Sequence, residues 1–188
     1  MKHHRAKLGQ NFLADNTVLK KIIEVADIGS DDIVLEIGPG QGSLTHALCQ
    51  KAKKVIAVEK DQKLYSYLRD KFDKIKNLEL VNNDILEFLA DTRGILRGST
   101  RKEYKIVANI PYYLTSFLLR KVFELDNPPT EMTLMVQKEV AERMTACPPQ
   151  MNLLALSVQM FASPEIKFLV SRKSFHPAPK VDSAVVNF

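Results

Sequence analysis

The sequence is poor in the residues that form covalent or metal-based cross-links, with two cysteines and four histidines among 188 residues. Cys49 and Cys147 stand alone, without a CxxC pair or a histidine at metal-ligand spacing. We therefore expect neither a disulfide framework nor a metal site, and we predict a protein of the reducing cytoplasm.

Long hydrophobic runs are also missing. The most apolar stretch, residues 153–158, is followed directly by Gln159, so no segment is long enough to span a bilayer. The basic residues at the start lead to Gly9 and not to an apolar core, so we expect no secretory signal. We expect no membrane partner.

The composition is that of an ordinary globular domain, with 45% hydrophobic and 26% charged residues. A chain of this length suits one domain with a full core. The net charge of +5 and the pI near 9.1 weakly favour a polyanionic partner.

Short apolar runs alternate with amphipathic segments, a pattern that predicts parallel strands joined by helices. The expected strands lie at residues 33–37, 55–58, 78–81, 106–108 and 132–136, with helices such as 64–72 and 116–125 between them. A helix is expected at 151–161. The last two strands, at 166–170 and 183–188, are joined by a proline-rich loop without a crossover helix, so they should pair antiparallel. The predicted fold is α/β and Rossmann-like, of the methyltransferase type. It has a seven-stranded, mainly parallel sheet and a C-terminal antiparallel hairpin.

A glycine-rich turn follows the first predicted strand, where residues 36–42 read Glu-Ile-Gly-Pro-Gly-Gln-Gly. Glycine permits positive φ and lets a ligand lie against bare backbone, although a tight turn without a ligand would also use it. A dinucleotide fingerprint would place its third glycine at Ser43.

Acidic residues follow the second and third predicted strands. Glu59 stands where an acid can accept hydrogen bonds from both ribose hydroxyls. Asp84 can accept from an adenine amino group while Ile85 packs on the ring. The alternatives are an exposed loop position for Glu59 and a helix N-cap at Asp84. Ligand groups at three neighbouring strand ends favour adenosine with a non-phosphate tail, which means S-adenosylmethionine.

An amide, a proline and an aromatic end the fourth predicted strand. Pro111 fixes its own φ and biases Ile110 towards extended geometry, which holds the Ile110 carbonyl in place. Asn109 adds a side-chain carbonyl and Tyr112 adds a flat face. Two acceptors and a stacking plate fit the amino group and ring of a nucleobase, whereas a plain strand-ending turn is the alternative.

These segments resemble the motifs of the small-subunit rRNA adenine dimethyltransferases. The matching segments are residues 8–13, 36–40, 109–112 and 175–186, together with Glu59 and Asp84. The erythromycin-resistance enzymes that methylate adenine in large-subunit rRNA are close cousins. Pro39 and the Val-Asp-Ser-Ala sequence at residues 181–184 look more like the housekeeping family.

The resemblance implies transfer of methyl groups from S-adenosylmethionine to N6 of adjacent adenosines near the 3′ end of small-subunit rRNA in a 30S-type particle, during ribosome biogenesis. The cofactor residues that it implies are Gln10, Asn11, Leu13, Gly38, Gly40, Glu59, Lys60, Asp84, Ile85 and Asn109. The catalytic residues that it implies are Asn109, Ile110, Pro111, Tyr112 and Phe175. Phe175 would be a second plate opposite Tyr112 for a flipped base, and a buried anchoring role is its alternative.

Basic residues near the predicted entrance of the pocket for the target base are expected to contact RNA, although each alone could be an ordinary solvated surface charge. They are Lys2, Arg5, Lys7, Arg93, Arg97, Arg101, Lys102, Arg172, Lys173 and Lys180. The family usually continues into a helical domain, whereas this sequence stops at Phe188, and residues 148–152 also depart from the family's usual segment. We therefore expect residues 1–188 to form a single catalytic domain without the family's C-terminal helical domain. Residues 1–15 should contact cofactor and RNA, and the protein should be monomeric.

Three alternative functions stay open. A resistance-type enzyme acting on large-subunit rRNA would share every catalytic residue named above. An rRNA-binding assembly factor with little catalysis would not need an intact 109–112 segment. A nicotinamide dehydrogenase is opposed by Ser43 at the third glycine position and by the absence of a plausible proton relay.

Overall fold

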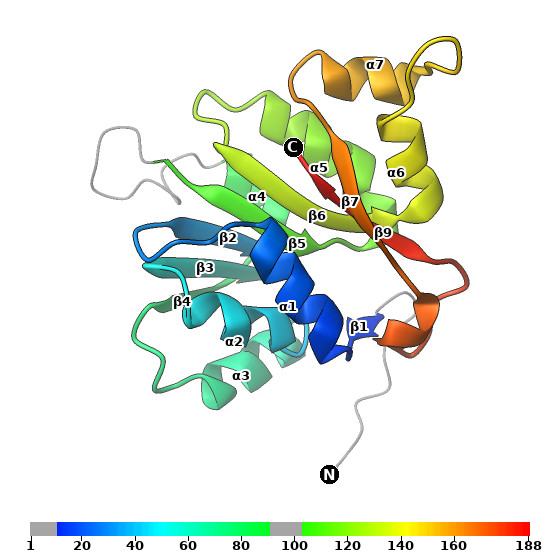
Figure 1. Cartoon of the computed structure of the whole chain (residues 1–188). Coiled ribbons are helices and arrows are strands. Elements are labelled where there is room, and N and C mark those ends of the chain that lie inside the picture. The colour runs from blue at the N-terminus through cyan, green and yellow to red at the C-terminus, as the bar shows by residue number, and fades with distance from the viewer. Residues whose placement is uncertain (1–10, 91–102) are drawn as a thin grey trace.

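The computed structural model describes residues 11–90 and 103–188, where helices cover both faces of a central sheet (Figure 1). Some predicted positions lie outside these ranges. They are Gln10 and the basic residues Lys2, Arg5, Lys7, Arg93, Arg97, Arg101 and Lys102.

The central sheet has seven strands in the order β4-β3-β2-β5-β6-β9-β7. Its strands are β2 (Ile33–Ile37), β3 (Lys54–Glu59), β4 (Leu78–Asn82), β5 (Lys105–Asn109), β6 (Glu131–Gln137), β7 (Glu165–Val170) and β9 (Ser183–Asn187). The first five of these pair in parallel, and β9 runs antiparallel to both β6 and β7. The predicted fold class, including the antiparallel hairpin, is confirmed.

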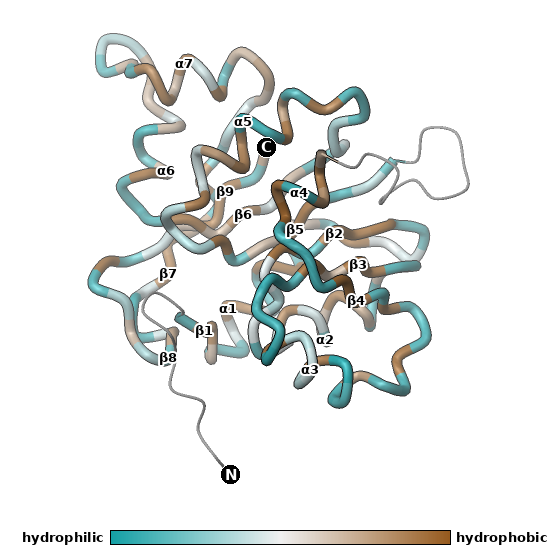
Figure 2. The backbone as a smooth tube through the Cα atoms, turned by 180° about the vertical axis from the view of Figure 1, so that it is seen from behind, coloured by the Kyte–Doolittle hydropathy of each residue, from teal (hydrophilic) through white to brown (hydrophobic). Residues whose placement is uncertain are grey.

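Helices pack on the two faces of this sheet in separate hydrophobic clusters. The helices are α1 (Asn16–Val25), α2 (Ser43–Cys49), α3 (Gln62–Lys71), α4 (Ile85–Ala90), α5 (Thr115–Phe123), α6 (Lys138–Met144) and α7 (Leu153–Gln159). Figures 1 and 2 show α1 and α2 on one face and α4 and α5 on the other. Because the middle strands are covered on both sides, they are apolar along almost their whole length and are coloured largely brown in Figure 2.

A second sheet of two short strands was not expected from the sequence. It pairs β1 (Phe12–Leu13) antiparallel with β8 (Phe175–His176), so that Leu13 faces Phe175. Ala14 N donates to Ser174 O at 2.9 Å, and the Ser174 hydroxyl donates to Asp15 Oδ2 at 3.0 Å. The predicted proline-rich loop therefore contains a short 3₁₀ helix, η2 (Arg172–Ser174), followed by β8. This pairing brings the N-terminal segment beside Phe175.

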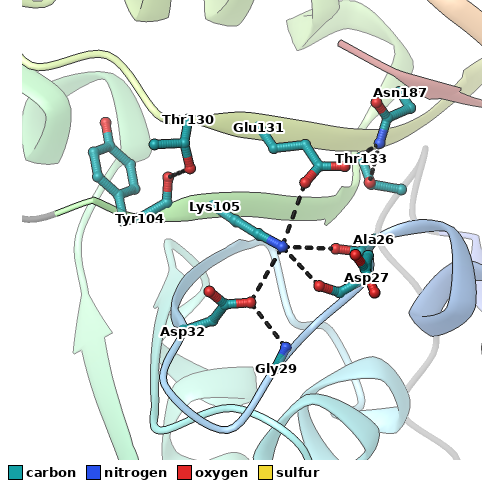
Figure 3. Close-up of polar contacts among 10 residues, drawn as sticks. All are labelled: Ala26, Asp27, Gly29, Asp32, Tyr104, Lys105, Thr130, Glu131, Thr133 and Asn187. Carbon is teal, nitrogen blue, oxygen red and sulfur yellow. Dashed lines mark hydrogen bonds and ion pairs between the residues drawn. The ribbon is translucent and has the colours of Figure 1, made fainter.

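A partly buried lysine links neighbouring elements at the amino ends of the parallel strands (Figure 3). Lys105, the first residue of β5, places its Nζ 3.2 Å from Asp32 Oδ2 and 3.4 Å from Glu131 Oε2. The same Nζ donates to Asp27 O at 2.7 Å. This network joins β5, β6 and the loop after α1, far from the carboxyl ends of the parallel strands.

Candidate functional site

The carboxyl ends of β2, β3, β4 and β5 meet at one edge of the sheet, and two adjoining pockets lie there. The first is lined by the predicted residues Asn11, Leu13, Gly38, Gly40, Glu59, Asn109, Ile110, Pro111, Tyr112 and Phe175. The second is lined by Lys60, Asp84 and Ile85, and it shares Gly38, Glu59 and Pro111 with the first. Every predicted site residue within the described ranges thus lies at one of these two pockets.

The glycine turn between β2 and α2 has two different reasons for its glycines. Gly38 has φ +65°, and a Cβ there would meet no atom within 4 Å, so bare backbone opens towards the pockets. Gly42 has φ +80°, and a Cβ there would lie 2.5 Å from Phe72 Cε2. Gly38 is therefore available to a ligand, whereas Gly42 also permits close packing of the turn against the end of α3.

Glu59 is buried, with 6% of its surface exposed, so it is not the exposed loop residue of the alternative interpretation. Its Oε2 accepts a hydrogen bond from Gly40 N at 3.3 Å, and its Oε1 accepts one from Asp61 N at 2.8 Å. Burial raises the pKa of this carboxyl above its ordinary value. Since a carboxylate offers about four acceptor positions, Glu59 can hold the glycine turn and still accept from two hydroxyls.

Asp84 caps α4 and pairs with Lys60. Its Oδ1 accepts from Leu86 N at 2.9 Å, and its Oδ2 lies 2.7 Å from Lys60 Nζ. The hydrogen bond from Lys60 lowers the pKa of Asp84, so the group is a carboxylate at neutral pH. Asp84 is therefore the N-cap of α4, as the alternative interpretation expected. The same carboxylate forms an ion pair with the Lys60 side chain, which is 74% exposed.

Asn109, at the end of β5, presents its amide at the first pocket. Its Nδ2 lies 3.5 Å from Asn11 O, and its side-chain oxygen accepts no hydrogen bond within the described ranges. Ile110 N donates to Met135 O at 3.2 Å, which fixes the next peptide against β6. Pro111 then turns the chain with φ −55° and ψ 128°. The segment therefore brings two neighbouring residues with carbonyl oxygens, Asn109 and Ile110, to the wall of the first pocket.

The two predicted aromatic plates differ in their surroundings. Tyr112 opens the 3₁₀ helix η1 (Tyr112–Leu114), and its hydroxyl lies 3.0 Å from the Ser183 hydroxyl. Phe175 lines the pocket but is only 5% exposed and packs in the core cluster with Leu13 and Leu19. Phe175 is thus a buried residue of the core, as the anchoring alternative expected, and it also lines the pocket.

Among the lining residues that were not assigned from the sequence, two bear on what the first pocket can hold. Glu36, in the middle of an apolar strand, is 1% exposed, and its Oε2 has no hydrogen-bond partner in the described part of the chain. Burial, reinforced by the charge of Glu59, raises the pKa of Glu36 to about 8. Phe12, on β1, covers the glycine turn, with its Cδ1 3.0 Å from where a Cβ on Gly40 would lie. A charged residue inside the run at 33–37 was the signal for Glu36.

The charges around the first pocket restrict what it can bind. It is lined by Glu36 and Glu59 and, as far as the structure describes the chain, by no cationic side chain. Such a lining offers oxygen acceptors to hydroxyls and to ammonium groups, and it offers no cation to neutralise a phosphate. The pyrophosphate of a dinucleotide therefore fits poorly against this glycine turn, whereas adenosine with a cationic tail fits well. In residues 11–90 and 103–188, no cluster of histidine, cysteine and acidic residues is placed to hold a metal ion. None of the described helices has the length and hydrophobicity of a membrane span.

Comparison with known proteins identifies similar sequences and structures. The family model described as ribosomal RNA adenine dimethylase matches residues 1–188. A protein of Dehalococcoides mccartyi (strain CBDB1) named ribosomal RNA small subunit methyltransferase A is 44% identical over 182 residues, which cover 97% of this chain and 61% of that protein. The chain thus spans about three fifths of the length of that curated relative.

Two solved structures of this kind are also similar. A dimethyladenosine transferase from Plasmodium falciparum superposes with a TM-score of 0.79 and 35% identity, over 93% of this chain and 62% of that one. The 23S rRNA methyltransferase ErmE superposes with a TM-score of 0.80 and 32% identity, over 94% of this chain and 68% of that one.

Proposed function

The chain belongs to the ribosomal RNA adenine dimethylase family, and on that premise we propose that it transfers methyl groups from S-adenosylmethionine to N6 of adjacent adenosines near the 3′ end of small-subunit rRNA. The observation that carries the proposal is the meeting of the cofactor residues and the 109–112 segment at two adjoining pockets. The name of the curated relative supports the small subunit as the target.

The cofactor would lie along the strand ends. Glu59 would accept hydrogen bonds from the ribose hydroxyls, and Asp84 and Ile85 would hold the adenine in the second pocket. Asn11, Leu13 and the bare backbone at Gly38 and Gly40 would hold the methionine end. The Oε2 atom of Glu36, which has no hydrogen-bond partner among the described residues, would accept from the ammonium group of that end, and the positive charge of that group would favour the ionised form of Glu36. When bound, S-adenosylmethionine supplies a methyl group that its sulfonium activates.

The protein's own contribution to the transfer is alignment. The amino nitrogen of adenine is a weak nucleophile because its lone pair is delocalised into the ring. The side-chain oxygen of Asn109 and the carbonyl of Ile110 would accept its two N–H bonds and direct the lone pair towards the methyl group. Pro111 holds that pair of acceptors in place, and Tyr112 would stack on the base. Base stacking on an aromatic side chain contributes roughly 1–3 kcal/mol, which helps to offset the cost of flipping the base out.

RNA docking would use the basic residues beside the target pocket. Arg172, Lys173 and Lys180 are exposed on either side of β8, which carries Phe175. We assign them to phosphate contacts, and we treat residues 1–188 as one catalytic domain. The monomeric state, the 30S-type particle and the cytoplasmic location stay predictions.

One experiment separates the candidate functions. The protein is incubated with tritiated S-adenosylmethionine and either immature 30S particles or 23S rRNA, and the labelled adenosines are mapped. Label on paired adenosines of 16S rRNA supports the proposal. Label on 23S rRNA alone would support the second candidate, a large-subunit enzyme, which the likeness to ErmE keeps open. Tight rRNA binding without label on either substrate would identify an assembly factor and contradict the proposed catalysis.

A further inference from the structure

The ring of Tyr112 is attached to a strand that is distant in sequence. Its hydroxyl lies 3.0 Å from the hydroxyl of Ser183, and either group can be the donor. Ser183 is the first residue of β9 and is completely buried, with 0% exposure. A serine hydroxyl at the end of a buried strand therefore meets Tyr112, one of the aromatic residues that line the first pocket.

The position of Ser183 is set by the backbone around it. It pairs with Gln137 of β6 on one side and with Val170 of β7 on the other. The preceding residue, Asp182, accepts a hydrogen bond from Lys138 N at its carbonyl (3.0 Å) and from Arg172 N at its carboxylate (2.8 Å). Because neighbours fix the strand on both sides, the Ser183 hydroxyl is a rigid attachment point.

The other end of the Tyr112 side chain is held as well. Pro111 restricts the backbone before it, and the Thr115 hydroxyl donates to Tyr112 O at 3.3 Å. Between these ends the ring can turn, because the torsion that sets the plane of a tyrosine ring has a broad minimum. A hydrogen bond at the hydroxyl restricts the ring's displacement and tilt.

We propose that Ser183 is a positioning residue of the target pocket, which fixes the Tyr112 ring against which the target adenine stacks. The inference rests on the proposed function, which assigns Tyr112 to the base. If the Tyr112 ring tilts, the adenine stacked on it tilts as well, and the N6 atom moves out of line with the methyl group and the sulfur. Small displacements of this kind slow a reaction without weakening cofactor binding.

The test is a double-mutant cycle with Ser183→Ala, Tyr112→Phe and the double variant. Ser157→Ala on α7 and Tyr67→Phe on α3 are the matched controls, because they make the same chemical changes outside both pockets. Methyl transfer to 30S particles gives kcat and KM, and calorimetry gives the Kd of S-adenosylhomocysteine. A third measurement needs no catalysis: the quenching of a single-stranded RNA that carries one 2-aminopurine, which reports stacking on the protein.

We expect each single variant to lower kcat by about threefold to tenfold, the range that one neutral hydrogen bond implies. The double variant should lose no more than the single variants, because both remove the same contact. The Kd of S-adenosylhomocysteine should stay unchanged, and the 2-aminopurine quench should weaken in all three variants. The two controls should match the wild type.

Other outcomes separate the inference from the proposed function. The inference is overturned if Ser183→Ala behaves like Ser157→Ala, or if the losses of the two single variants multiply in the double variant. A Ser183→Ala variant with weakened cofactor binding would also overturn it, because the effect would then be a general loss of structure. A wild type that quenches 2-aminopurine but transfers no methyl group contradicts the proposed function alone, and the quench then decides the inference. A wild type that does neither overturns both.

Discussion

Glu36→Gln should stabilise the protein relative to the wild type, and this advantage should grow as the pH rises. The side chain is 1% exposed, and burial raises its pKa from 4.5 to about 8. Between these two values the folded protein keeps the Glu36 proton that the unfolded chain has lost. The folded state therefore loses stability as the pH rises through this window, and it loses no more above the folded pKa. Glutamine has nearly the same shape and does not titrate, so Glu36→Gln escapes this loss.

The size of the effect follows from the pKa shift. Each pKa unit corresponds to about 1.36 kcal/mol, so a shift from 4.5 to about 8 sets an upper limit of about 5 kcal/mol. Relaxation around the charged group reduces that limit. We expect the stability advantage of Glu36→Gln to be small near pH 4.5, to grow by up to about 1.4 kcal/mol per pH unit and to level off above about pH 8.

The assay is urea unfolding of both proteins without cofactor at several pH values across this window. Glu79→Gln is the matched control, because Glu79 forms a surface ion pair with Lys54 and is 44% exposed. Its stability difference should stay within about 1 kcal/mol at every pH. A Glu36→Gln advantage that is constant with pH, or that grows as the pH falls, would refute the argument. The same variant should bind S-adenosylmethionine more weakly, since the glutamine amide cannot carry the negative charge that a carboxylate would present to the ammonium group.

Three further predictions test other parts of the molecule. Glu59→Ala should weaken S-adenosylmethionine binding by about 10- to 100-fold in calorimetry, because hydrogen bonds to a charged group are lost, whereas Glu79→Ala should not. Tighter binding of NAD than of S-adenosylhomocysteine would contradict the assignment of S-adenosylmethionine as the cofactor. Asn109→Ala should lower kcat by about 100-fold or more while cofactor affinity changes only a few-fold, and near wild-type turnover would show that Asn109 is not an acceptor for the target amino group. Lys105→Met should cost about 1–3 kcal/mol of unfolding free energy in urea, because Asp32 and Glu131 lose their partner, whereas the more exposed Lys54→Met should cost less than about 1 kcal/mol. Equal losses for the two lysines would contradict the structural role of the network.

Much of the central sheet could be predicted from the sequence because its strands are buried on both faces. Such strands are continuous apolar runs bounded by turns, and the runs at 33–37 and 132–136 coincide closely with β2 and β6. The two-residue strands β1 and β8 have no periodicity to detect. Their pairing joins Leu13 to Phe175, a contact that only the folded chain creates. Residues 138–144, which form α6, were also not recognised as a helix.

Most residues of the candidate site could also be predicted from the sequence, but for a different reason. In a parallel sheet the carboxyl ends of neighbouring strands meet at one edge, so Glu59, Asp84 and Asn109 could be grouped from their positions after three strands. Burial could not be read in the same way. Sequence reasoning did not show that Gly42 faces the Phe72 ring or that the Oε2 atom of Glu36 lacks a hydrogen-bond partner among the described residues. These properties depend on side chains brought together from different elements.

The two sides of the site rest on different parts of the sheet, and this explains why substitutions can separate them. Glu59 lies at the end of the parallel strand β3, with both carboxylate oxygens tied to nearby backbone N–H groups. Tyr112 is held from the antiparallel strand β9, through Ser183. A change in β9 can therefore move the plate for the target base while the carboxylate proposed for the ribose stays in place. Because Glu59→Ala and Ser183→Ala act on opposite sides of one reaction, the first should appear in the Kd of the cofactor and the second in kcat.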